Sequence, residues 1–158
     1  MNFIGKHQVL AGIYPDSTLW NTGSPNSTPC VNMGKYGHAT FVVIQGTGAA
    51  GSATIIIEAC TTAAGGSPTA IAATYRLCTT ADVWGAVTAL PVGGVVFGAA
   101  SNQMLVIEVD AVDLQVQPTK PYLRLKATVS DATAVDAGCI IVLSEASYQQ
   151  DVPTTAIT

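Results

Sequence analysis

The chain has 158 residues, of which 49% are hydrophobic and only 10% are charged, and its formal net charge is −4. Globular proteins carry about 25% charged residues, so this chain is short of the groups that usually solvate a surface. Six Lys and Arg against ten Asp and Glu do not make the basic footprint of a nucleic-acid binder. The high hydrophobic content excludes a disordered chain, and the length fits one domain with a substantial core.

The first 35 residues predict an N-terminal arm and linker. Pro, Gly, Ser and Asn crowd residues 22–29 and interrupt any regular ladder. Apolar residues still occur at intervals along the segment, and those expected to contact a neighbouring molecule are Phe3, Ile4, Val9, Leu10 and Trp20. The alternative is that this segment packs on its own domain. No secretory signal and no apolar run of about 18 residues is visible, so we expect no membrane partner.

From residue 36 to residue 150 the chain predicts one all-β domain. Runs rich in β-branched and aromatic residues alternate with Gly- and Pro-containing turns. The expected strands are 39–45, 53–60, 71–78, 82–90, 104–110, 122–129 and 139–145, with 93–100 as a short edge strand and a short helix near 110–114. This pattern favours an antiparallel β-sandwich, jelly-roll-like, followed by a C-terminal tail at 151–158.

For two of these strands the sequence also predicts which faces are buried. In the strand 122–129, Leu123, Leu125, Ala127 and Val129 fall on one face, and polar residues fall on the other. This alternation indicates a half-buried antiparallel strand. The last strand, 139–145, is apolar at nearly every position and is expected to be buried on both faces.

Four charged residues interrupt the apolar strands. They are Glu58, Arg76, Glu108 and Arg124. A charge inside a strand of a packed sheet is costly unless it is paired. We therefore predict structural cross-strand ion pairs among them, although the sequence leaves open which Glu meets which Arg.

The four cysteines, Cys30, Cys60, Cys78 and Cys139, form no CxxC pair and have no histidine nearby in the sequence. A zinc site is therefore not expected. We expect four reduced thiols that are buried as small hydrophobic groups. The alternative is a disulfide between Cys60 and Cys78, since each ends an apolar run.

The remaining candidate motifs point away from catalysis. His38 stands at a strand entrance without a nucleophile elbow. Glu108, Asp110 and Asp113 could bind Ca²⁺, but they match no calcium-loop pattern, so solvated carboxylates are expected. The glycine run at 46–51 precedes a strand, whereas a dinucleotide site needs a helix. We expect no enzyme, no cofactor and no metal. The aromatic residues are too scattered to predict a sugar-binding platform.

Several strand segments carry a family resemblance between Tyr36 and Tyr148. It is strongest at residues 107–111 and 120–125, and it extends over 36–43, 57–60, 69–71, 75–76, 82–85 and 102–104. These segments resemble one group of small virion proteins of tailed bacteriophages, which look like head decoration (cement) proteins. The resemblance implies a β-rich, often jelly-roll, trimer on the capsid lattice. The first 35 residues lie outside it.

The resemblance thus implies a structural protein of the virion, made in the host cytoplasm. It would bind the outside of the phage head as a homotrimer, contact the major capsid protein and stabilise the lattice. Two alternatives remain open. One is a tail or baseplate component, and the other is a glycan-binding adhesion module on the virion surface.

Overall fold

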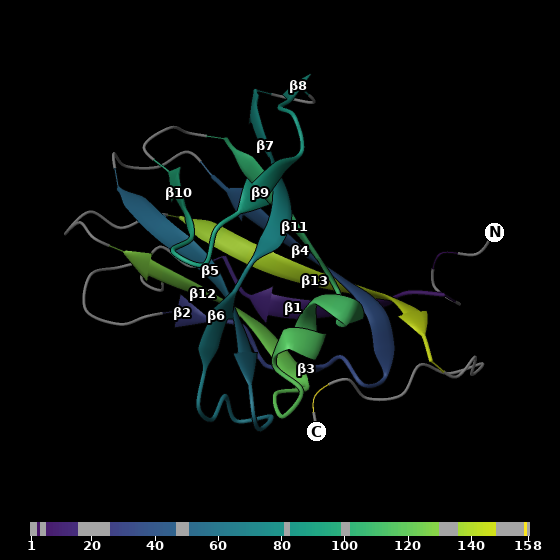
Figure 1. Cartoon of the computed structure of the whole chain (residues 1–158). Helices are drawn as coiled ribbons and strands as arrows, with labels where there is room; N and C mark the ends of the chain where they lie inside the picture. Colours follow the sequence, from purple (N-terminus) through teal and green to yellow (C-terminus); the bar gives the residue numbers. More distant parts are fainter. Residues whose placement is uncertain are drawn as a thin grey trace.

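Two antiparallel β-sheets face each other in the computed structural model of the chain (Figure 1). The structure describes residues 3, 6–15, 26–46, 51–80, 83–98, 102–129, 136–147 and 157. The strands are β1 (Gln8–Ile13), β2 (Asn26–Ser27), β3 (Val31–Asn32), β4 (Tyr36–Gln45), β5 (Ser52–Cys60), β6 (Thr69–Ile71), β7 (Ala73–Thr80), β8 (Val83–Trp84), β9 (Thr88–Leu90), β10 (Val95–Gly98), β11 (Met104–Asp110), β12 (Tyr122–Val129) and β13 (Ala137–Ala146). This architecture confirms the all-β sandwich that the sequence predicts.

The larger sheet has the order β1-β13-β4-β11-β7-β8, with β9 also paired to β7. The smaller sheet has the order β10-β5-β12-β2, with β3 also paired to β12 and β6 to β5. The chain changes sheets between β9 and β10, so both strands lie at sheet edges on the same side of the sandwich. Among the described residues, no helix is long and apolar enough to cross a membrane.

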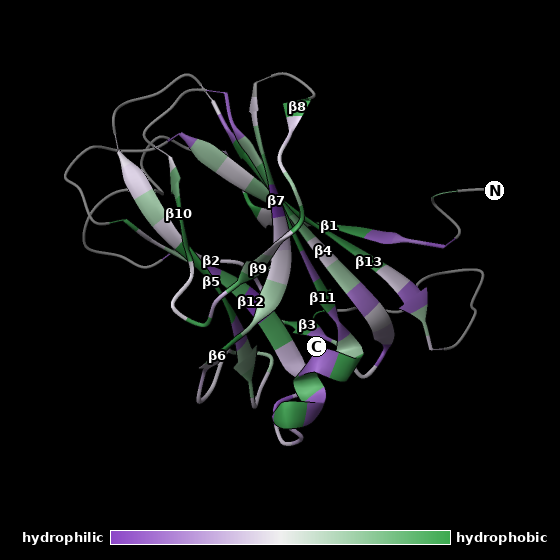
Figure 2. Cartoon of the chain, turned by 45° about the horizontal axis from the view of Figure 1, so that its top comes forward, coloured by the Kyte–Doolittle hydropathy of each residue, from purple (hydrophilic) through white to green (hydrophobic). Residues whose placement is uncertain are grey.

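The core lies between the sheets, and alternation along the strands decides which residues enter it. Leu123, Leu125, Ala127 and Val129 of β12 are all buried, as predicted. Hydrophobic and hydrophilic residues alternate along the long strands in Figure 2. The largest side chains that are fully buried are Phe41, Phe97, Ile55, Ile57, Leu90, Leu105, Ile107, Leu123, Leu125, Ile141 and Leu143. They come from both sheets, as the interdigitating faces of a sandwich require.

Two local predictions need correction, and a third is confirmed. The expected strand at 82–90 is two short strands, β8 and β9, separated at Gly85–Val87. The last strand is not buried on both faces, since Ile140 of β13 is 41% exposed on the outer side. The short helix expected near 110–114 is confirmed as the 3₁₀ helix η1 (Ala111–Val116). At its start, the carboxylate of Asp113 accepts the backbone N–H of Asp110 at 3.1 Å.

The sandwich also begins earlier than residue 36. Strand β1 pairs with β13 over five residue pairs, and β2 and β3 pair with β12. These strands cap rows of backbone N–H and C=O groups that would otherwise stay unpaired at sheet edges. These segments are too short or too interrupted for their sequences to predict a strand. The domain start predicted at residue 36 is therefore too late. The predicted tail at 151–158 lies outside the described residues, apart from Ile157.

Candidate interaction surface

The N-terminal residues predicted as contacts divide into three kinds. Phe3 is 53% exposed and stacks on the ring of His7, with ring centroids 4.4 Å apart. Val9, on β1, is 54% exposed, whereas Leu10 packs partly buried against the core of its own domain. Ile4 and Trp20 lie outside the described residues. Among the predicted contact residues that the structure describes, Phe3 and Val9 are therefore the ones exposed enough to meet another molecule.

Glu58 and Arg124 are brought together on the outer face of the smaller sheet. They are directly opposite each other in the register of β5 and β12. Arg124 donates from Nε and Nη2 to Oε2 of Glu58, at 2.7 and 2.6 Å, and Nζ of Lys126 lies 3.6 Å from Oε1. Only 7% of the Glu58 side chain is exposed. A buried carboxylate is thus neutralised by one bidentate arginine and one lysine.

The hairpin between β5 and β6 covers this ion pair. Gly65 has φ +81°, and a Cβ at this position would collide with Nη1 of Arg124. Glycine tolerates that backbone conformation and leaves room for the guanidinium. Burial by itself would lower the pKa of Arg124, but the hydrogen bond and the charge of Glu58 outweigh burial and raise that pKa. The pair is therefore a structural feature of a covered site.

All four cysteines are buried and form no disulfide, which confirms the prediction of four buried, reduced thiols. The alternative disulfide between Cys60 and Cys78 is wrong, because both thiols are free. Cys60 belongs to β5 in the smaller sheet and Cys78 to β7 in the larger one. The neighbour of Cys60 is Cys30, whose thiol is hydrogen-bonded to it. Burial raises the pKa of Cys30 to about 12, and burial raises the pKa of Cys139 to about 12 as well.

Arg76 and Glu108 are on the exposed face of the larger sheet, and no ion pair between them is present in the described part of the chain. The register places Arg76 opposite Val106 and Glu108 opposite Thr74, so the two charges are diagonal neighbours. Instead, Nε of Arg76 donates to the carbonyl of Gly85 at 3.1 Å, and its guanidinium lies over the ring of Trp84, 5.8 Å from the centroid. The predicted pairing therefore applies to Glu58 and Arg124 alone.

A shallow hollow separates the two charges. Its walls come from β7, β8, β11 and the segment between β8 and β9, and its volume is about 280 Å³. The lining side chains used below, which define the β7–β11 hollow, are those of Thr74, Arg76, Trp84, Val87, Val106 and Glu108. The sequence reasoning missed this site because Trp84 and Glu108 are far apart along the chain and only the pairing of β7 with β8 and β11 brings them together.

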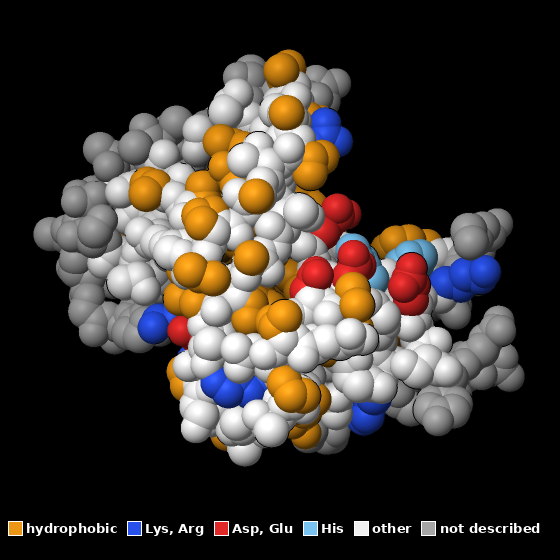
Figure 3. Space-filling model, viewed as in Figure 1, with side chains coloured by type: hydrophobic (Ala, Val, Ile, Leu, Met, Phe, Trp, Pro, Cys, Tyr) orange, Lys and Arg blue, Asp and Glu red, His pale blue; other side chains and the backbone are white. Residues whose placement is uncertain are grey.

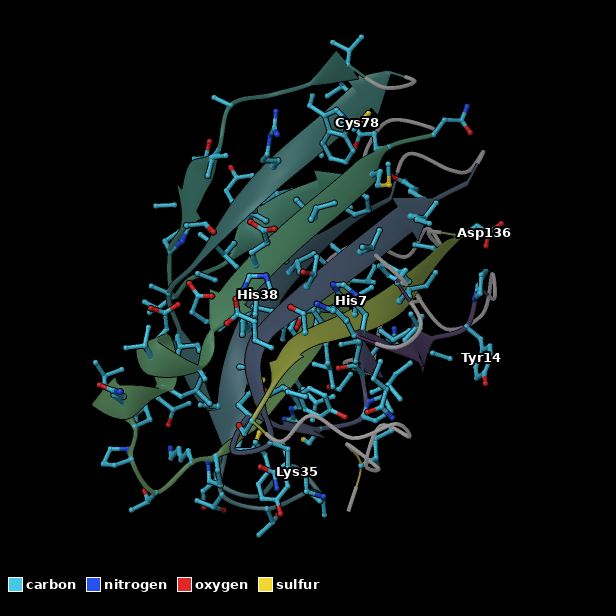
Figure 4. All side chains as sticks on the ribbon, turned by 90° about the vertical axis from the view of Figure 1, so that its right-hand side faces the viewer. His7, Tyr14, Lys35, His38, Cys78 and Asp136 are labelled. Carbon is cyan, nitrogen blue, oxygen red and sulfur yellow. The ribbon has the colours of Figure 1, made fainter. Side chains whose placement is uncertain are left out.

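His38 lies beside the hollow with carboxylates around it. Its Nδ1 is 2.6 Å from Oδ1 of Asp110, and its Nε2 is 3.2 Å from Oγ1 of Thr40 and 3.9 Å from Oε1 of Glu108. Figure 4 shows His38 near the middle of this sheet and Cys78 toward its upper end, so the two do not meet. Within the described ranges, no three His, Cys, Asp or Glu residues are grouped as metal ligands.

An uncharged edge runs beside these polar groups. Residues 83–98 contain no Asp, Glu, Lys, Arg or His, and they form the adjoining edge strands β8, β9 and β10. Four valines of this segment are exposed. Val87 (62%) lines the hollow, and the other three, which we term the valine surface, are Val83 (61%), Val92 (59%) and Val96 (68%). In Figure 3, hydrophobic side chains spread over this part of the molecule, while the acidic residues gather to one side of it.

No model of a known protein family matches this chain, and no curated protein sequence matches it.

Proposed function

We propose that this protein is a structural component of a tailed-phage virion, a decoration protein that binds the outside of the head. It acts as a homotrimer, contacts the major capsid protein and stabilises the shell by adding buried interface between capsomers. The resemblance of the strand segments to head decoration proteins favours this role, and the β-sandwich fold is compatible with it. The observation that carries the proposal is the valine surface on an edge that lacks charge.

The valine surface is suited to contact with protein rather than with water. Exposed apolar residues that gather on one edge of a monomer mark interaction sites, and the buried centre of a protein interface is depleted of charged residues. Each of these valines is more than half exposed, so covering one would contribute roughly 1 kcal/mol. The edge strands beneath them also offer unpaired backbone groups to a neighbouring chain.

The oligomeric state is the first test. Light scattering of the purified protein is expected to give the mass of a trimer. A double variant, Val92→Asp with Val96→Asp, buries two charges in the contact and should weaken self-association at least tenfold. The matched control is Val112→Asp on η1, where the valine is equally exposed, at 58%, but lies outside the valine surface. A wild-type monomer, or a double variant that stays trimeric, would contradict this part of the proposal.

Binding to heads is the second test. Mature heads that lack this protein are mixed with it and sedimented, and we expect saturable binding and a higher temperature of head disruption. The arm residues Phe3 and Val9 are exposed, so changing both to Ser should weaken head binding without changing the trimer. Binding to tails, or a ring of six subunits, would instead favour a tail or baseplate component. Failure to bind any part of the virion would refute both.

A further inference from the structure

The β7–β11 hollow presents a fixed hydrogen-bond donor and a fixed acceptor on either side of an open space. Arg76 is held in place by the carbonyl of Gly85 and the ring of Trp84, and this leaves its terminal nitrogens to the hollow. The carboxylate of Glu108 stands on the next strand, with 54% of its side chain exposed. Diagonal neighbours on adjacent strands are about 7–8 Å apart at the backbone, and both side chains line the open hollow.

Besides the two charged residues, the hollow is lined by Thr74, Tyr75, Trp84, Val87 and Val106. Trp84 is partly buried, and Val87 and Val106 line the hollow beside it. Thr74 adds a hydroxyl that both donates and accepts hydrogen bonds. A small number of well-placed polar groups in an apolar wall is the composition typical of a site for a small molecule.

We propose that the β7–β11 hollow binds a single neutral sugar unit. Sugar hydroxyls both donate and accept, so they can satisfy the guanidinium of Arg76, the carboxylate of Glu108 and the hydroxyl of Thr74 at once. The C–H face of the ring packs against Trp84, Val87 and Val106. The two charges of the hollow cancel, which favours a neutral ligand: Glu108 repels an anion, and Arg76 repels a cation.

The size of the hollow limits the ligand to one ring. Its volume of about 280 Å³ is at the lower end of the roughly 300–1,000 Å³ usual for ligand sites. A ligand of about a dozen non-hydrogen atoms in an open site is expected to bind in the millimolar range. The site would therefore recognise one residue of a larger surface glycan, and this recognition does not depend on the proposed role on the head.

The test starts from an array of bacterial and common neutral glycans probed with the full chain. The sugar unit shared by the bound glycans is then titrated into the Trp20→Phe variant, in which Trp84 is the remaining tryptophan. We expect a saturable change in fluorescence. In the same background, Arg76→Met and Glu108→Gln should each raise Kd tenfold or more, because each removes a charge-assisted hydrogen bond. Val96→Ser, outside the hollow, should leave Kd unchanged.

Each contrary result overturns the proposal. The absence of binding to any glycan on the array, together with no fluorescence change when neutral monosaccharides are titrated beyond the millimolar range, excludes a sugar site in this hollow. Binding that survives both Arg76→Met and Glu108→Gln belongs to another place on the surface. A change of oligomeric mass in these two variants, without sugar binding by the wild type, would make the hollow an interface between subunits. Melting curves of the variants confirm that they are folded, and head binding by the wild type tests the decoration role separately.

Discussion

Replacing Arg124 by Met is expected to destabilise the protein because it leaves the carboxylate of Glu58 buried with a weaker partner. Arg124 makes two contacts with Oε2 of Glu58, at 2.7 and 2.6 Å, whereas Lys126 lies 3.6 Å from the other oxygen. Removing one partner of a buried pair costs about 3–5 kcal/mol. Since Lys126 remains and 18% of the Arg124 side chain is exposed, we expect about 2–4 kcal/mol. In a domain of this length, that loss lowers Tm by about 5–15 °C.

The assay is thermal and urea unfolding followed by circular dichroism, and the chain supplies its own control. Arg76 is an exposed arginine on a strand of the larger sheet, and it contacts only the carbonyl of Gly85 and the ring of Trp84 among the interactions described above. Arg76→Met should therefore cost about 1 kcal/mol or less. If Arg124→Met lowers Tm no further than Arg76→Met does, the reasoning about the buried pair is refuted.

A double variant separates the loss of the pair from the loss of packing. Glu58→Leu combined with Arg124→Met removes both charges, so no uncompensated carboxylate remains. We expect this variant to be more stable than Arg124→Met alone. A double variant that is less stable than the single one would mean that the arginine acts through its contacts with the covering hairpin rather than through its charge.

The remaining predictions concern glycines and thiols. Gly65→Ala should cost about 1–2 kcal/mol because of its positive φ and its closeness to Arg124, whereas Gly93→Ala, with nothing within 4 Å of the new Cβ, should change stability little. Gly12→Val should displace β1 and speed its amide exchange, since a Cβ there lies 2.9 Å from the carbonyl of Cys139. Because all four cysteines are buried, a thiol reagent at pH 8 should label them only after unfolding, and rapid labelling of the folded protein would contradict their placement. Cys30 and Cys139 keep their protons in the folded state up to a pKa of about 12, against an ordinary value of 9.0, so the free energy of unfolding should fall as pH rises from about 9 to 12, and a flat pH profile would contradict this.

The strands were predictable where the side-chain pattern is local. The strand Tyr122–Val129 follows directly from its alternation, and Met104–Asp110 from its β-branched and apolar residues. The presence of Glu58 and Arg124 in apolar strands also predicted an ion pair, because burial of an unpaired charge is too costly. These are properties that each segment carries by itself.

The partners across the sheets depended on the register. Arg124 faces Glu58 because β12 runs antiparallel to β5 in one alignment. A shift of β12 by one residue would turn Arg124 to the other face of the sheet, away from Glu58. Arg76 and Glu108 are also an arginine and a glutamate on two paired strands. The register of β7 and β11, however, places them in diagonal rather than directly opposite positions. Nothing in either segment alone distinguishes the two outcomes.

The composition of the chain is rich in apolar residues and poor in charge. It already indicated a surface that is short of solvating groups. The sequence by itself also determined that residues 83–98 carry no charge. The tertiary structure decided where that segment lies: it joins the edges of the two sheets, where none of the described strands or helices covers its exposed valines. It likewise decided that Cys60 meets Cys30 and that Trp84 meets Arg76. Contacts between residues distant in the chain arise from the pairing and stacking of sheets, which no single stretch of sequence encodes.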